Sequence, residues 1–185
     1  MPDPLEALAA WFGTSLEGVQ GLTKLGNGHI NNTWLVTTHT QTHTHWGDVV
    51  LQQLSLDVFA APEKLMANLS ALLTVVAASE SFDYQLPRPL PSATGELLVT
   101  IDDGKSLSYW RLCGYIANAR ALETLSTPTE ARAAGLAFGD FQRTARALAP
   151  ELLEPVIEGF LQLEGYWRSL KEGVDRKKGG VDRNT

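Results

Sequence analysis

The sequence predicts an α+β fold, and two observations carry this prediction. Between residues 19 and 54, short runs rich in β-branched and apolar residues alternate with turns that contain glycine, asparagine and histidine, a pattern typical of antiparallel strands. From Pro62, and again from Pro128, apolar residues recur with the helical period over several turns, which indicates amphipathic helices. We therefore expect a sheet that is interrupted by one helix and followed by others.

The composition is that of a soluble globular chain. Its 185 residues, 44% hydrophobic and 19% charged, suffice for one ordinary domain or two small lobes. The formal net charge of −6 argues against general binding to nucleic acid or to anionic membranes. No apolar run approaches the roughly 18 residues of a membrane span, and the acidic start lacks the apolar core of a secretory signal. We expect a cytoplasmic protein without a nucleic acid or membrane partner.

The boundaries of the shorter elements follow from turn residues and changes of period. Residues 4–12 place apolar side chains at helical spacing before Gly13, which predicts a short first helix. The proline-rich stretch 86–96 predicts a loop. The expected strands are residues 19–25, 33–38, 48–54, 97–101 and 108–116, the last two joined by a turn at 102–104.

The longest apolar stripes predict the longest helices. One begins at Pro62 and runs to Val76. Another spans residues 128–148, where Thr127 and Glu130 form a capping box. Its buried stripe is expected to consist of Ala134, Ala137, Phe138, Phe141, Ala145 and Leu148. A further helix is expected within residues 151–170, with Leu161, Leu163, Tyr166, Trp167 and Leu170 available for burial.

The last fifteen residues differ from the rest of the chain. Residues 171–185 hold five basic and three acidic side chains, and Val174 and Val181 are their only apolar ones. Such a segment buries too little apolar surface to offset its ordering entropy. We expect residues 171–185 to be disordered.

A glycine-rich turn is the most informative local motif. Gly26 and Gly28 lie between two expected strands, with Asn31 and Asn32 close behind. Glycine lets a phosphate approach main-chain N–H groups, and asparagine tolerates the same tight geometry while adding a donor. A tight hairpin that needs these residues only for its shape is the alternative reading.

The order of elements around this turn resembles the amino-terminal lobe of a kinase. The sequence resembles the phosphotransferase enzyme family, the aminoglycoside phosphotransferase and choline kinase relatives, and within it the N-acetylhexosamine 1-kinase-like sugar kinases. The resemblance implies a protein-kinase-like N-terminal lobe, an antiparallel sheet plus a helix, with the first helices of the C-terminal lobe. The segments that resemble the family, in the family's order, are residues 26–33, 50–54, 58–69, 109–116 and 134–142.

The resemblance also implies a site for ATP with Mg²⁺. The glycine turn would cover the phosphates, a side chain of the third strand would contact them, and main-chain groups of a hinge would bond the adenine edge. The implied nucleotide-binding residues are Gly26, Asn27, Gly28, His29, Ile30, Asn31, Asn32, Thr33, Gln52, Gly114, Tyr115 and Ile116.

The sequence departs from the family pattern at residues that matter for chemistry. Gln52 and Gln53 stand where the strand commonly presents Lys or Arg, and Ala67 stands where the following helix often shows Glu. The family's catalytic loop resembles His-x-Asp-x-x-x-x-Asn, with an Asp base and metal ligands. No histidine follows His45, and no Asp-x-x-x-x-Asn occurs anywhere in the chain. No catalytic or metal-binding residue is therefore assigned, and whether the chain is an enzyme stays open.

The resulting division of the chain is a kinase-like lobe at 1–116, a hinge and connector at 117–127, and the start of a helical lobe at 128–170. One hypothesis is a truncated sugar kinase relative that keeps the nucleotide-binding half and is inactive alone, the sugar being a substrate only of the full-length relative. The alternative is a non-catalytic lobe that binds nucleotide weakly or serves as a protein-interaction module. The exposed face of the later helices would then be covered by a homodimer partner or by the 151–170 helix.

Three other motifs have simpler interpretations. His39, His43 and His45 would share one face of an extended strand and could hold Zn²⁺ or Ni²⁺, but a solvated hairpin end is favoured. The Asp102–Gly104 stretch is interpreted as a turn in preference to a calcium loop. Cys113, the single cysteine, excludes an internal disulfide and is interpreted as a small core residue.

Overall fold

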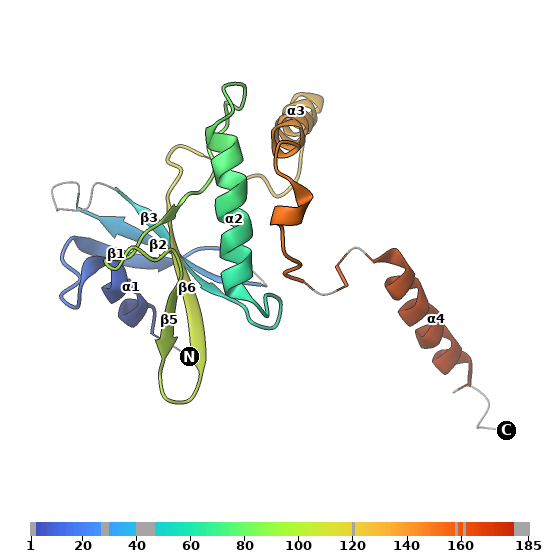
Figure 1. Cartoon of the computed structure of the whole chain (residues 1–185), viewed down its shortest axis with the longest axis horizontal. Coiled ribbons are helices and arrows are strands. Elements are labelled where there is room, and N and C mark those ends of the chain that lie inside the picture. Colours follow the sequence, from blue (N-terminus) through green and yellow to red (C-terminus); the bar gives the residue numbers. More distant parts are fainter. Residues whose placement is uncertain are drawn as a thin grey trace.

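The α+β class expected from the sequence is confirmed. The computed structural model describes residues 3–26, 30–39, 47–119, 121–157, 159–160 and 162–179. An antiparallel sheet carries helices on both sides, and further helices follow it in the chain (Figure 1). The late helices lie at the opposite end of the molecule from the amino-terminal helix.

The sheet is a meander that the later strands extend. Strands β1 (Val19–Lys24), β2 (Asn32–Thr38) and β3 (Val49–Leu54) pair in sequence order, and β3 pairs in turn with β6 (Leu107–Gly114). Two short strands, β4 (Pro89–Leu90) and β5 (Val99–Asp102), share the other edge of β6. The strand β6 is therefore central, and it brings residues around 110 next to those around 52.

Alternation along the strands gives the sheet two distinct faces. Helix α1 (Pro4–Phe12) covers the first, which we call the α1 face. The opposite face, the α2 face, lies toward helix α2 (Pro62–Ala77) (Figure 1). The α1 face presents the buried side chains Val36, Val49, Leu51, Trp110 and Leu112. The α2 face presents Thr33, Leu35, Val50, Gln52, Arg111 and Cys113, as the strand register requires.

Helix α1 is part of the core of the sheet. Leu8 is fully buried, and Trp11 and Phe12 are nearly so. The indole Nε1–H of Trp11 donates to the carbonyl of Leu90 over 3.0 Å, which ties the helix to strand β4. The Asp3 carboxylate caps the helix by accepting from the Leu5 amide at 2.9 Å. The predicted first helix is thus confirmed and packs on the sheet.

The loop expected at residues 86–96 contains the short strand β4. Pro89 pairs with Cys113 and Leu90 with Leu112. Proline lacks an N–H, so it is tolerated in a strand only where no partner needs that donor, as at an edge. The proline-rich composition predicted the loop, but it did not predict the short edge strand within the loop.

Helix α3 (Pro128–Ala145) begins as expected and is less buried than expected. The Thr127 hydroxyl accepts from the Glu130 amide while the Glu130 carboxylate accepts from the Thr127 amide, a complete capping box. Leu148, just past the helix, is buried, but Phe138 is 70% exposed. The interpretation of Phe138 as a buried residue was wrong because α3 contacts α2 and segment 82–86 along only part of its surface.

The segment after α3 is attached to helix α2. A short 3₁₀ turn spans Pro150–Leu152. Beyond it, the Asn68 amide Nδ2 donates to the Glu154 carbonyl at 2.8 Å, and Asn68 Oδ1 accepts from the Glu154 amide at 3.0 Å. Lys64 pairs with the Glu154 carboxylate. Two hydrogen bonds and an ion pair thus hold this segment against α2.

Helix α4 (Leu163–Gly179) corrects two expectations. Residues 171–179, expected to be disordered, continue this helix, because Lys, Glu and Arg have high helix propensities. Residues 180–185 and Leu161 lie outside the described residues. The helix also does not cover α3, since it extends away from the rest of the chain (Figure 1). Its apolar side chains Leu163, Tyr166, Trp167, Leu170 and Val174 are all exposed.

Among the described residues, no helix is both long enough and apolar enough to cross a bilayer.

Candidate functional site

The turn between β1 and β2 closes tightly around its glycine. Gly26 has φ +63°, a left-handed conformation that favours glycine. The amide of Leu25 donates to the carbonyl of Thr33 at 2.8 Å, which closes the turn. Ile30, which precedes β2, is exposed. The predicted site residues Asn27, Gly28 and His29 lie outside the described residues.

The two asparagines of the turn bond within the fold. Asn31 Oδ1 accepts from the main-chain amide of Ser55 at 3.0 Å, and Asn32 Nδ2 donates to Gln53 Oε1 at 3.1 Å. Both contacts fasten the turn to the end of β3. These two side chains therefore position the turn.

A polar chain crosses three strands on the α2 face. Gln52 Nε2 donates to Thr33 Oγ1 at 3.1 Å, and Gln52 Oε1 accepts from Arg111 Nε at 2.9 Å. Register explains the contacts, since Thr33 faces Gln52 across β2 and β3 and Gln52 faces Arg111 across β3 and β6. Predicted site residues Thr33 and Gln52 are thus brought together, and Arg111 joins them.

Arg111 is the residue of this cluster that the sequence alone did not single out. It is half-buried, and its Nη1 lies 3.9 Å from the sulfur of Met66 on helix α2. The signal that points to it is register. Gln52 and Arg111 face each other directly across β3 and β6, although 59 residues separate them in the chain.

The predicted hinge lies at the end of β6, and its three residues differ in their main-chain bonding. The Gly114 amide donates to the Arg88 carbonyl at 3.0 Å, and the Tyr115 amide donates to the Asp48 carbonyl at 3.2 Å. Ile116 forms no main-chain hydrogen bond within the part of the chain that the structure describes. Of the three, Ile116 is therefore the one with both an N–H and a carbonyl available to a ligand.

Two further groups near the cluster have shifted pKa values. Cys113 is buried as expected, and burial raises the pKa of its thiol despite the Arg111 cation, which acts in the opposite sense. The Glu63 carboxylate raises the pKa of Tyr109 through its charge, with burial and a hydrogen bond between the two side chains adding to the shift. Glu63, the first acid of α2, is thus engaged by Tyr109.

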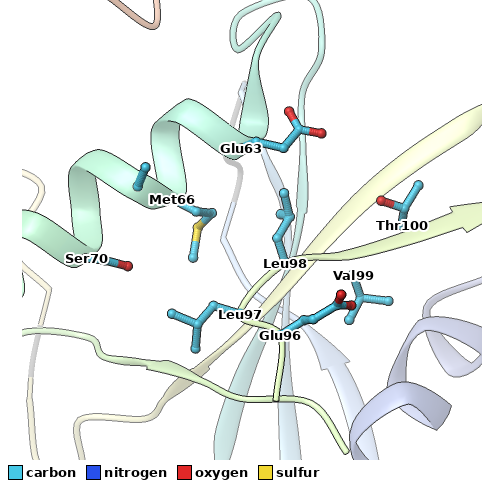
Figure 2. Close-up of a pocket in the computed structure, with 9 residues that line it drawn as sticks. Glu63, Met66, Ser70, Glu96, Leu97, Leu98, Val99 and Thr100 are labelled. Carbon is cyan, nitrogen blue, oxygen red and sulfur yellow. The ribbon is translucent and has the colours of Figure 1, made fainter. Parts of the chain in front are cut away.

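A cavity of about 580 Å³ lies between helix α2 and the segment leading into β5. Figure 2 shows Glu63, Met66 and Ser70 on the helix side, facing Glu96, Leu97 and Leu98. None of the predicted site residues lines it. Met66 borders both this cavity and Arg111, so the cavity lies behind the polar cluster rather than forming it.

The remaining sequence candidates are resolved where the structure describes them. His39 is exposed, and its ring lies within hydrogen-bonding distance of the Gln20 side chain, while His43 and His45 lie outside the described residues. Asp102 and Asp103 accept from the main-chain amides of the turn that follows them, as the turn interpretation requires. Within the described ranges, no three metal-ligating side chains come together.

The fold of this chain is similar to that of known kinase structures. No family model matches the sequence. A microcompartment-associated aminopropanol kinase structure matches over 75% of this chain with a TM-score of 0.55 and 19% identity. The amicoumacin kinase hAmiN, solved in complex with AMP-PNP, Ca²⁺ and Ami, matches over 77% with a TM-score of 0.51 and 14% identity.

The matches cover only part of each kinase. This chain spans 38% and 39% of the two solved chains. At these identities the likeness is one of fold. The chain therefore has an α+β fold similar to part of these two kinase structures.

Proposed function

We propose that this chain is the nucleotide-binding part of an ATP-dependent phosphotransferase. The observation that carries the proposal is the polar cluster of Thr33, Gln52 and Arg111 on the α2 face. The fold likeness to two kinases supports it, one of them solved with the ATP analogue AMP-PNP. In this reading residues 1–116 form the nucleotide-binding lobe, 117–127 the connector, and 128–170 the start of the helical lobe.

The proposed site orients a nucleotide along strand β3. Ile116 offers an N–H and a carbonyl for the adenine edge, and Val50, partly exposed on β3, offers an apolar surface on the α2 face. Gln52 lies two residues further along β3, about 7 Å away at the rise of a strand. The main chain of the Gly26 turn would lie over the phosphates.

The proposal includes no phosphoryl transfer by this chain alone. Transfer to an alcohol needs a base for the hydroxyl proton and carboxylate or amide ligands for Mg²⁺. The chain has no Asp-x-x-x-x-Asn sequence, and its described residues bring no three metal-ligating side chains together. The residues present do not fit a Mg²⁺ site, and a sugar substrate belongs to the proposed longer enzyme.

Nucleotide binding is expected to be weak and catalysis undetectable. Gln52 adds no charge to the site, so titration calorimetry with ATP·Mg²⁺ is expected to give a dissociation constant well above 1 μM. A coupled assay for ADP release with N-acetylglucosamine is expected to show no turnover. Sub-micromolar binding would contradict the assigned role of Gln52, and measurable turnover would contradict the absence of catalytic residues.

A second candidate function, protein interaction, is favoured by two exposed apolar surfaces. Helix α4 presents a stripe that includes Tyr166 and Trp167, which are 54% and 62% exposed. A cavity of about 380 Å³ is lined by apolar and aromatic side chains of segment 82–86 and helix α3. Each copy carries both the apolar stripe on α4 and the apolar groove beside α3. We therefore infer that the stripe of a second copy of this chain binds in the groove. The groove residues are Phe82, Tyr84, Gln85, Leu86, Ala137, Phe138 and Phe141.

Self-association tests this second candidate. The sedimentation coefficient of the wild-type protein is expected to rise with concentration in the micromolar range, because large exposed apolar patches drive association. Trp167→Glu is expected to abolish the rise by placing a charge in the stripe. Ser169→Glu, on the same helix but outside the stripe, is the control that should leave it intact. A monomer at all concentrations would exclude the homodimer.

A further inference from the structure

The guanidinium of Arg111 is a half-buried cation without an ionic partner in the described part of the chain. The ion pairs found there join Lys64 to Glu154 and Arg143 to Asp140. Arg111 contacts an amide oxygen through Nε and a thioether through Nη1. Glu63, the one acid of helix α2, acts on Tyr109, whose pKa its charge raises. A cation removed from water normally has a counter-charge, because desolvating it alone is costly.

Gln52 holds this cation in one orientation. Its amide oxygen accepts from Arg111 Nε, and its amide nitrogen donates to Thr33 Oγ1, so the amide is engaged at both ends. An arginine has five N–H donors in a planar fork that matches phosphate oxygens. With Nε committed to Gln52, the terminal nitrogens have a thioether as their one described acceptor, and a thioether is a weak one.

We propose that Arg111 supplies the positive charge for nucleotide phosphates, with Gln52 as its positioning residue. This inference rests on the proposed function. It assigns the positive charge to Arg111 on β6, because Gln52 on β3 offers only a neutral amide. Arg111 faces the same side of the sheet as Val50 and Cys113 and lies two residues further along β6 from the hinge than Cys113. That position is the phosphate end of the nucleotide orientation proposed above.

The test compares ligands that differ only in phosphate. ATP and adenosine are titrated calorimetrically into wild-type protein and Arg111→Gln, at ligand concentrations up to the millimolar range. A hydrogen bond between two charged groups is stronger than a neutral one, so Arg111→Gln is expected to weaken ATP binding at least tenfold. Adenosine binding is expected to change less than twofold. Arg111→Lys, which keeps the charge, is expected to restore part of the ATP affinity.

Neighbouring glutamines provide a matched pair of variants. Gln52→Glu places a carboxylate beside Arg111 and is expected to weaken ATP binding about as much as Arg111→Gln. Gln53→Glu adds the same charge one residue further along β3, where the side chain lies on the α1 face and contacts Asn32. This variant is expected to change ATP binding less than threefold.

The possible results separate the two claims. Equal loss of ATP and adenosine binding in Arg111→Gln would mean that Arg111 has a purely structural role. Unchanged ATP binding in this variant would mean that Arg111 has no role in binding. Either result would overturn the inference and leave the proposed function standing. Wild-type protein that binds neither ATP nor adenosine would overturn both. A loss confined to phosphate-bearing ligands, shared by Gln52→Glu and absent in Gln53→Glu, is the result that the inference predicts.

Discussion

Replacing Trp110 with alanine is expected to lower the free energy of unfolding by about 3–5 kcal/mol, as for other large-to-small changes in a core. Trp110 is fully buried at the centre of β6, and its ring lies 5.5 Å from that of Trp34. Its Nε1–H donates to Ser108 Oγ at 2.9 Å, so the polar atom of the ring is satisfied as well. Alanine would leave a cavity where β3, β5 and β6 meet.

Urea unfolding followed by circular dichroism measures this loss. Trp167→Ala, the same substitution at an exposed position of α4, is expected to change the free energy by about 0.5 kcal/mol or less. If Trp110→Ala fails to fold, Trp110→Phe, which keeps most of the ring, serves in its place and is expected to lose less. Equal effects of Trp110→Ala and Trp167→Ala would show that the sheet core is not where the described packing places it.

Replacing Leu8 with alanine is expected to cost about 2–5 kcal/mol. Leu8 is fully buried between α1 and the sheet, together with Val49, Leu51 and Val99. The loss tests whether α1 is an integral layer of the fold. Amide hydrogen exchange reports the same event locally, because loosening α1 should reduce the protection of β3 and β5.

Leu5 on the same helix is the matched control for Leu8. It is 45% exposed, so Leu5→Ala removes the same atoms while little buried surface is lost. We expect a change of about 0.5 kcal/mol or less in urea unfolding. A small effect of Leu8→Ala, comparable to that of Leu5→Ala, would mean that α1 can detach from the sheet.

Much of the fold follows from local patterns, and the exceptions have physical reasons. Helix α1 and the start of α3 carry start signals that act over a few residues, so the sequence predicts them closely. Strand β4 was missed because Pro89 suppresses a strand prediction, and only its edge position beside β6 makes the strand possible. The extension of α4 to Gly179 was missed because a polar composition suggests disorder, although its residues favour helix.

The candidate site was harder to predict from the sequence than the fold, because it depends on pairing between strands that are distant in the chain. The glycine turn and Gln52 are local signals, and a resemblance to known kinases points to them. The partner of Gln52 is Arg111, and only the register between β3 and β6 reveals it. The bonding of Asn31 to Ser55 likewise depends on a tertiary contact.

The most direct test of the central claim, nucleotide binding on the α2 face, is a titration of ¹⁵N-labelled protein with ATP·Mg²⁺ followed by amide chemical shifts. The account predicts that the largest shifts occur at the Gly26 turn, at Gln52 and Arg111, and at Ile116. Amides of α1 and α4, on the opposite side of the sheet and beyond it, should shift little. Largest shifts in α1 or α4, or no shifts at millimolar ATP, would contradict the claim.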